Sequence, residues 1–213
     1  MKGFRLGELS ILTGPTGSGK TTFLSEYSLD LCLSGVSTLW CSLEVPVGKL
    51  IAWMMHQYAK VDYCSLPEET ATKRFEEFYE KIKVDLKNMY FFDQHGTVPI
   101  DELIKAVQAV HNSKKLDHVL VDNLQFMQGS SKHGSFDKYM NQDLIFSEFR
   151  ELASKLNVHV TLVVHPRKEM DGADLHANSL YGGVKASQEA DNIFIIQKFV
   201  KPWIDPPFTK FLQ

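Results

Sequence analysis

A glycine-rich segment near the start of the chain carries the residue types that bind phosphate. It is Gly14-Pro-Thr-Gly-Ser-Gly-Lys20-Thr21, directly after the apolar run ELSILT and before the helix-compatible stretch TFLSEYSLDLCL. Glycines let successive backbone N–H groups turn toward phosphate oxygens, and the following helix adds the positive end of its dipole. A turn that is merely tight is the alternative. The predicted phosphate-binding residues are Gly14, Pro15, Thr16, Gly17, Ser18, Gly19, Lys20, Thr21 and Thr22.

Within this loop, Lys20 and Thr21 have separate predicted tasks. Lys20 would contact the β and γ phosphates of a nucleoside triphosphate such as ATP, and the Thr21 hydroxyl would bind Mg²⁺. Such sites need a second group on the metal side, an Asp at the end of a buried strand, and HVLVD places Asp122 there. We expect Asp122 to hold Mg²⁺ through water. Without the phosphate loop, an Asp at a strand end would more often be a cap or turn residue.

Hydrolysis also needs a carboxylate that orients and deprotonates the attacking water. The residue after Asp122 is Asn123, not a glutamate, so the base must come from another segment. The strand TLWCSLE ends in Glu44. If that strand lies beside the phosphate-loop strand, Glu44 reaches the carboxyl edge of the sheet, where ligands bind. Glu44 is therefore the predicted base, with a surface glutamate opening a loop as the alternative.

One further polar group ends a strand at the same predicted edge. The run VTLVVHP brings His165 out of an apolar segment. A neutral or charged imidazole there can hydrogen-bond the γ phosphate, which makes His165 a candidate sensor and catalytic group. A histidine with a structural role is the alternative.

The elements that must position these residues form an α/β pattern. Short apolar runs rich in β-branched residues alternate with longer segments of helical period, as in a mainly parallel, twisted sheet with helices on both faces. Several runs are apolar nearly throughout, as strands buried on both faces should be. The predicted strands are Leu9–Thr13, Thr38–Leu43, Met89–Phe92, His118–Val121, Val158–Val164 and Ile193–Ile196.

Three segments have helical periodicity. One stripe comprises Ile100, Leu103, Ile104, Val107 and Val110, and a second comprises Ile145, Phe149, Leu152 and Leu156. Both are expected to pack on the sheet. Residues 68–87 are charged with a few aromatic residues on one side, which predicts an amphipathic surface helix. Two polar, glycine-containing loops, 128–138 and 168–183, are longer than a simple connection requires.

Composition excludes several classes of protein. The 213 residues are 44% hydrophobic and 23% charged, an ordinary globular composition, and no run of 18 apolar residues predicts membrane insertion. The three cysteines, Cys32, Cys41 and Cys64, form no C-x-x-C pair, which argues against a zinc site. The net charge of −3 means that any nucleic-acid partner must be held by a local positive cluster.

Taken together, five segments resemble a known family. GPTGSGKTTF, TLWCSLE, HVLVDNLQFM, VTLVVHPRKE and ASQEADN, in this order, closely resemble the motor domain of the Twinkle family of mitochondrial replicative DNA helicases. More distantly they resemble phage T7-type primase-helicases and bacterial DnaB helicases. The resemblance spans nearly the whole chain, and HPRKE and DNLQFM are more specific than a phosphate loop alone.

The resemblance implies a RecA-like P-loop NTPase domain covering residues 1–213. It implies a homo-oligomeric ring, usually a hexamer, that hydrolyses NTP between subunits and moves 5′ to 3′ on single-stranded DNA during replication. It supports the roles assigned above to Lys20, Thr21, Glu44, Asp122 and His165. It also directs the two long loops to the central channel, with Arg167, Lys168 and Lys185 as candidate DNA contacts. The expected compartment depends on which relative the protein corresponds to: mitochondrial for a Twinkle-type protein, and cytoplasmic for a phage or bacterial one.

The chain departs from the family in one catalytic feature. Relatives continue beyond the strand corresponding to TKFLQ into a basic segment with an arginine finger, whereas this sequence ends at Gln213. None of its four arginines, Arg5, Arg74, Arg150 and Arg167, matches that finger. A missing finger can cost on the order of 10³ to 10⁵ in turnover. We therefore expect a truncated motor domain, slow until completed.

Other functions fit part of the pattern. A RecA-type recombinase shares the fold and the ATP site, although HPRK and DNLQFM favour a helicase. A small-molecule phosphotransferase would need an arginine-rich lid, which four scattered arginines do not provide. A nucleotide-binding regulatory domain without turnover stays open because of the missing finger.

Overall fold

The computed structural model describes residues 3–61, 65–128, 138–166, 175–176, 179–180, 183–199 and 208–212. Strands and helices alternate along most of this length, as the sequence predicts. The strands are β1 (Leu9–Thr13), β2 (Thr38–Ser42), β3 (Met89–Phe92), β4 (Val98–Pro99), β5 (His118–Asp122), β6 (Met127–Gln128), β7 (His159–Val164), β8 (Asn192–Phe199) and β9 (Phe208–Leu212). All six predicted strands are confirmed, with ends that differ by a few residues at most.

Seven strands form one sheet in the order β3-β2-β5-β7-β1-β8-β9. Its first six strands run parallel, and β9 pairs antiparallel with β8 at one edge. The short strands β4 and β6 form a separate pair. The predicted mainly parallel α/β sheet is therefore confirmed.

One expectation about strand order is wrong. Glu44 was expected on a strand beside the phosphate-loop strand β1, but β2 lies between β3 and β5, with β5 and β7 separating it from β1. An apolar run is buried wherever it lies inside a parallel sheet, so its composition does not specify its neighbours. Because all these strands are parallel, β2 still ends at the same edge as β1.

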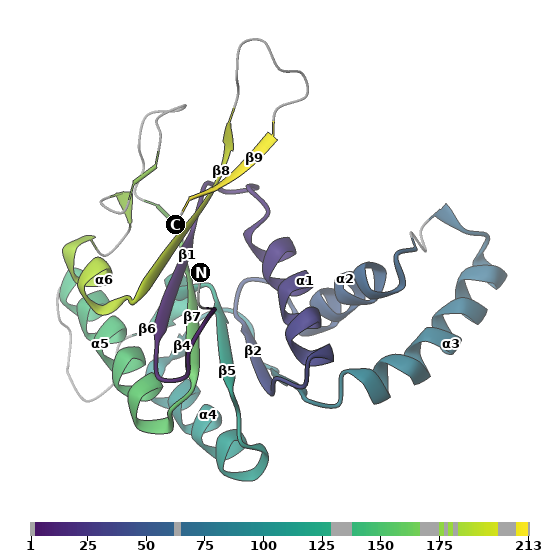
Figure 1. Cartoon of the computed structure of the whole chain (residues 1–213), viewed down its shortest axis with the longest axis horizontal. Coiled ribbons are helices and arrows are strands. Elements are labelled where there is room, and N and C mark those ends of the chain that lie inside the picture. Colours follow the sequence, from purple (N-terminus) through teal and green to yellow (C-terminus); the bar gives the residue numbers. More distant parts are fainter. Residues whose placement is uncertain are drawn as a thin grey trace.

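Helices cover both faces of this sheet. They are α1 (Lys20–Leu33), α2 (Val47–Ala59), α3 (Glu68–Asp85), α4 (Ile100–Lys114), α5 (Lys138–Leu156) and α6 (Gly183–Glu189), with a short 3₁₀ helix, η2 (Leu124–Phe126). Figure 1 places α1 and α2 on one side of the sheet and α4, α5 and α6 on the other. Both predicted helical stripes, on α4 and α5, pack in the core.

Side-chain alternation along the strands divides the core into two parts. In β5, Val119 and Val121 face the α4–α5 layer, whereas Leu120 faces the α1–α2 layer. In β1, Ile11 and Leu12 divide between the layers in the same way. Successive side chains of a strand point to opposite faces, so near-continuous apolar runs bury both. This two-sided packing fixes the strands whose carboxyl ends carry the polar residues.

Helix α3 has no buried residue and extends away from the sheet (Figure 1). It is the predicted surface helix over residues 68–87. Phe75 and Tyr79 stack on each other at its surface, and both are exposed. Helix α2, which was not predicted, buries Leu50, Met54 and Met55.

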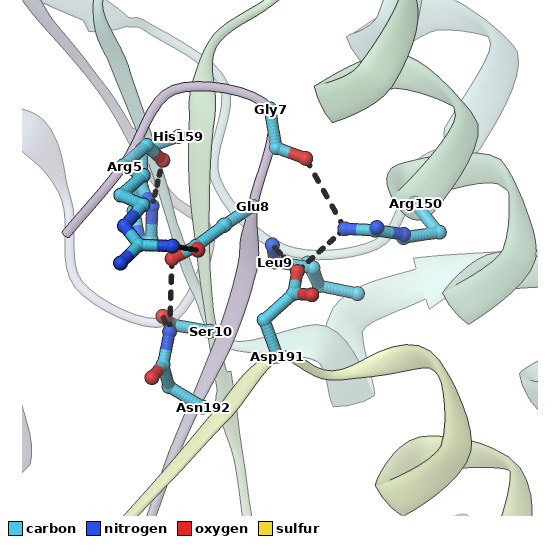
Figure 2. A network of polar contacts seen from close by, with 9 residues as sticks. All are labelled: Arg5, Gly7, Glu8, Leu9, Ser10, Arg150, His159, Asp191 and Asn192. Carbon is cyan, nitrogen blue, oxygen red and sulfur yellow. Dashed lines mark hydrogen bonds and ion pairs between the residues drawn. The ribbon is translucent and has the colours of Figure 1, made fainter.

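A polar network closes the amino end of the sheet (Figure 2). Arg150 on α5 donates from Nη1 to the Gly7 carbonyl at 3.1 Å and to Asp191 Oδ2 at 2.5 Å. The same carboxylate oxygen accepts the Leu9 N–H at 2.8 Å. These contacts join α5, the start of β1 and the residue before β8.

Among the described helices, none is both long enough and apolar enough to span a membrane.

Candidate functional site

The predicted phosphate loop connects β1 to α1 as a compact, glycine-dependent turn. Gly14 follows β1, and a Cβ there would lie only 2.2 Å from the Ile196 carbonyl oxygen of β8, so the site requires glycine. Gly17 and Gly19 have φ of 74° and 92°, in the left-handed region that other residues rarely adopt. The loop is further closed by the Ser18 N–H, which donates to the Pro15 carbonyl at 3.1 Å.

Helix α1 begins with its N-terminus open toward the loop. Its cap residue is Gly19, which supplies no side-chain acceptor, and its first turn contains no acidic residue. The first N–H groups of a helix lack partners within the helix and attract anions. The other predicted loop residues are arranged around this end: Pro15, Thr16 and Thr22 are exposed, and Ser18 and Thr21 are partly buried.

Lys20 is buried beside the loop. Its Nζ donates to the carbonyls of Gly14 and Pro15, at 2.8 and 2.9 Å. Burial lowers its pKa, and the nearby carboxylates of Asp122 and Glu44 oppose that shift. The ammonium group is thus placed within the loop that is predicted to hold phosphates.

Thr21 and Asp122 meet as the sequence predicts. The Thr21 hydroxyl donates to Asp122 Oδ2 at 2.6 Å, although the residues are 101 positions apart. Asp122 is 1% exposed, and its Oδ1 has no hydrogen-bond partner within the described part of the chain. Burial raises the pKa of Asp122 to about 6, partly opposed by the hydrogen bond from Thr21. A buried carboxylate oxygen without a donor suits a metal-bound water, so these residues fit Mg²⁺.

Within the described residues, no group of three or more His, Cys, Asp or Glu side chains forms a metal site. Magnesium prefers octahedral oxygen ligands and commonly keeps water while binding substrate phosphates. Thr21 and Asp122 together with phosphate oxygens and water would meet that preference. The pair therefore fits a magnesium ion that arrives with a nucleotide.

Glu44 reaches this edge through the loop after β2. The N–H groups of Leu43 and Glu44 donate to the Asp122 carbonyl at 2.6 and 3.1 Å. The Glu44 side chain is 41% exposed, so solvent water can reach its carboxylate. Its Oε2 lies 3.7 Å from His165 Nε2.

His165 follows β7, as predicted, and its side chain is mostly buried. Burial lowers its pKa, and the positive charge of Lys20 lowers it further, opposed by Glu44. The structure therefore brings Lys20, Thr21, Asp122, Glu44 and His165 together at one sheet edge, the same five residues that the sequence singled out.

Sequence reasoning missed one residue of this group. Asn123, which is 1% exposed, donates from Nδ2 to Glu44 Oε2 and to His165 Nε2, the latter at 3.0 Å. The only signal was its place directly after Asp122, where a glutamate was sought.

The three predicted DNA contacts are only partly placed. Arg167 and Lys168 lie outside the described residues, as does most of both long loops. Lys185, on α6, pairs with Glu189 one turn later at 2.6 Å. Its charge is thus already partly balanced within its own helix.

Comparison with known proteins identifies the family. A family model described as an AAA domain matches residues 1–171, most of the 213-residue chain. The chain belongs to the AAA domain family.

Two solved structures show the fold relationship of this AAA domain. One, described as an ATPase domain, is 15% identical with a TM-score of 0.75, and the match covers 92% of this chain and 71% of that one. The other, a DnaB-like replicative helicase solved in a study of its interactions with primase, is 15% identical with a TM-score of 0.76. That match covers 92% of this chain but 48% of the helicase. The chain therefore shares the α/β, RecA-like fold of these two structures.

Proposed function

We propose that this AAA domain is the NTP-hydrolysing motor of a ring-forming replicative DNA helicase. The observation that carries the proposal is the meeting of Lys20, the Thr21–Asp122 pair and Glu44 at one sheet edge. The fold shared with a DnaB-like helicase adds support. DNLQFM and HPRKE favour this function over that of a RecA-type recombinase.

The site residues divide the chemistry among themselves. Lys20 and the N–H groups of the loop would bind the β and γ phosphates, which places the leaving group. Bound Mg²⁺, held by Thr21 and through water by Asp122, would neutralise phosphate charge. Glu44, the accessible carboxylate, would orient the attacking water and accept its proton.

His165 would report the state of the γ phosphate. Its Nε2 accepts a hydrogen bond from Asn123, which leaves Nδ1 as the protonated nitrogen of the neutral ring. A ring N–H is the group that a phosphate oxygen can bind. When that contact is lost after hydrolysis, the contacts of His165 Nε2 with Asn123 and Glu44 would change.

In the family that the motifs resemble, an arginine finger completes the site, and none of the four arginines of this sequence matches it. Arg5 and Arg150 belong to the network at the amino end of the sheet, whereas the phosphate loop follows the carboxyl end of β1. Five strand residues separate these ends by roughly 16 Å. Active sites between subunits would make turnover depend on assembly of the ring, which is usually hexameric in the family that the motifs resemble.

The type of helicase, its direction of movement and its compartment are proposed from the sequence motifs. They favour a Twinkle-type helicase that moves 5′ to 3′ on single-stranded DNA in the mitochondrial nucleoid; a phage or bacterial relative would act in the cytoplasm. Arg167, Lys168 and Lys185 are proposed to contact the DNA backbone. Several weak phosphate contacts per subunit, repeated around a ring, would give the salt-dependent binding typical of such proteins.

The test is Mg²⁺-dependent ATP hydrolysis over a range of protein concentrations, with and without single-stranded DNA, using Lys20→Ala as the blank. Turnover that rises more steeply than protein concentration and increases with DNA would support a ring motor. Nucleotide binding without turnover under all conditions would instead indicate a regulatory domain. Strand pairing without duplex unwinding would indicate a recombinase.

A further inference from the structure

Asn123 is a buried amide whose polar atoms all face the functional site or its supporting backbone. It follows β5 directly and is 1% exposed. Its Oδ1 accepts the Gln125 N–H at 3.0 Å, and its Nδ2 donates to Glu44 Oε2 and to His165 Nε2. Its contact with His165 determines which imidazole nitrogen is protonated, but its contact with Glu44 has no assigned role in the proposed chemistry.

The orientation of the amide is determined by its neighbours. A backbone N–H can only donate, so the atom that Gln125 contacts must be the oxygen. The NH₂ group then faces Glu44 and His165, and each of its two hydrogens has one acceptor. Since 3₁₀ helix η2 holds Gln125 in place, the direction of both donors is set by the backbone.

The two acceptors need such a fixed donor. Glu44 is half-exposed, and a free glutamate side chain samples many rotamers, so holding it in one rotamer costs conformational entropy. Its carboxylate lies 3.7 Å from His165 Nε2, so both groups meet at the Asn123 nitrogen. One amide thereby fixes two side chains that come from the ends of different strands, β2 and β7.

We propose that Asn123 is a positioning residue that holds the base Glu44 and the sensor His165 in a single joint arrangement. The inference rests on the proposed hydrolytic function. It requires a donor at position 123, because both partners accept there. An aspartate of the same shape would keep the acceptor for Gln125 but replace the donor with a negative charge beside Glu44.

The kinetic test compares wild type, Asn123→Ala and Asn123→Asp for kcat, KM and the Kd of Mg²⁺-ATP. We expect kcat to fall about 10- to 100-fold in both variants, because misplacing a catalytic group by about 1 Å costs up to 10². The nucleotide Kd should change less than threefold. Asn123→Asp, which retains the Gln125 contact, separates loss of the donor from loss of local folding. Gln125→Ala, an exposed side chain, is the matched control and should behave as wild type.

A double-variant cycle distinguishes positioning from a general structural effect. In a Glu44→Ala background there is no base left to position. The factor by which Asn123→Ala slows single-turnover hydrolysis should therefore be at least five times smaller in that background than in wild type. Equal losses in both backgrounds, or a kcat of Asn123→Asp within twofold of wild type, would overturn the proposal.

A spectroscopic readout separates this inference from the proposed function. In the nucleotide-free protein, imidazole ¹⁵N signals should show His165 Nε2 as a hydrogen-bonded acceptor, and that signature should disappear in Asn123→Ala. If wild type binds ATP without hydrolysing it, the helicase proposal fails while this signature still decides the role of Asn123. An unchanged His165 spectrum in Asn123→Ala would refute the positioning role.

Discussion

The Thr21 hydroxyl donates to Asp122 Oδ2 at 2.6 Å, joining the first turn of α1 to the end of β5. This contact satisfies one carboxylate oxygen and leaves Oδ1 buried without a donor in the described part of the chain. The arrangement favours a bound cation over an empty, charged site. It also makes Asp122 a source of instability whenever it is ionised and no cation is present.

Asp122→Asn is expected to stabilise the nucleotide-free protein at pH 8. Burial raises the pKa of Asp122 to about 6, whereas an unfolded aspartate titrates near 4. The folded state therefore holds this proton more tightly, so the stability that it contributes is present below pH 4 and is lost as pH rises through about 6. The shift corresponds to at most about 3 kcal/mol. Urea unfolding of wild type and Asp122→Asn at pH 4.5 and pH 8 measures it.

The matched control for this pH dependence is Asp30→Asn, which alters an exposed aspartate on α1. It should leave the difference between pH 4.5 and pH 8 unchanged. The Asp122→Asn protein should also lose Mg²⁺-dependent turnover, since an amide binds the cation weakly. A parallel pH dependence in wild type and Asp122→Asn would contradict the assignment of this carboxylate.

Gly14→Ala should destabilise the chain and weaken nucleotide binding together. Its Cβ would lie 2.2 Å from the Ile196 carbonyl oxygen, a backbone atom of β8 that cannot rotate away. Overpacking of this kind costs about 1–3 kcal/mol, and the loop must shift to relieve it. Thermal unfolding and titration with a fluorescent ATP analogue measure the two effects.

Gly48→Ala is the control for that change. Gly48 lies in α2, and a Cβ there meets nothing within 4 Å. Alanine favours a helix over glycine by up to about 1 kcal/mol, so this variant should be as stable as wild type or slightly more stable. If Gly14→Ala behaved like Gly48→Ala, the close approach of the loop to β8 would not be essential.

The strands and the five principal site residues could be predicted because each has a local signal. A buried parallel strand is apolar throughout, and a polar residue directly after it must lie at the carboxyl edge, as Asp122 and His165 do. The position of Glu44 at that edge was predicted correctly for a partly wrong reason. Parallel direction, and not adjacency to β1, brings it there.

The remaining features could not be predicted because they depend on three-dimensional contacts between distant segments. Strand order depends on how the crossover helices pack, which apolar runs do not encode. No sequence signal distinguishes Asn123 from other polar residues, because its contacts with Glu44 and His165 form only in the folded chain. Lys185 is a different case: it was predicted as a DNA contact, and its pairing with Glu189 four residues later is a local contact within helix α6.

Asp191→Ala should destabilise the amino end of the sheet without altering nucleotide affinity. Asp191 Oδ2 accepts from the buried Leu9 N–H and from Arg150. Its removal leaves the Leu9 N–H without an acceptor, which lowers the free energy of unfolding by about 1–3 kcal/mol. The ion pair itself is about one-third exposed and adds little after solvent screening. Urea unfolding and nucleotide Kd check both statements.

Lys155→Ala is the comparison for Asp191→Ala, because Lys155 also forms an ion pair, with Glu151, on the exposed side of α5. An exposed pair contributes less than about 1 kcal/mol, so this variant should unfold close to the wild-type urea concentration. Equal stability losses in the two variants would mean that the Leu9 N–H contact contributes nothing.

Glu44→Gln is the sharpest test of the proposed catalytic role because it preserves shape and removes only the base. The glutamine oxygen can still accept from Asn123, and nucleotide affinity should stay within threefold of wild type. Without a group that accepts the proton of the attacking water, kcat should fall about 10²- to 10⁴-fold. Glu26→Gln, an exposed change on α1, provides the control and should turn over as wild type does. If Glu44→Gln kept its turnover, Glu44 would not be the catalytic base, and its contacts with Asn123 and His165 would have a structural role only.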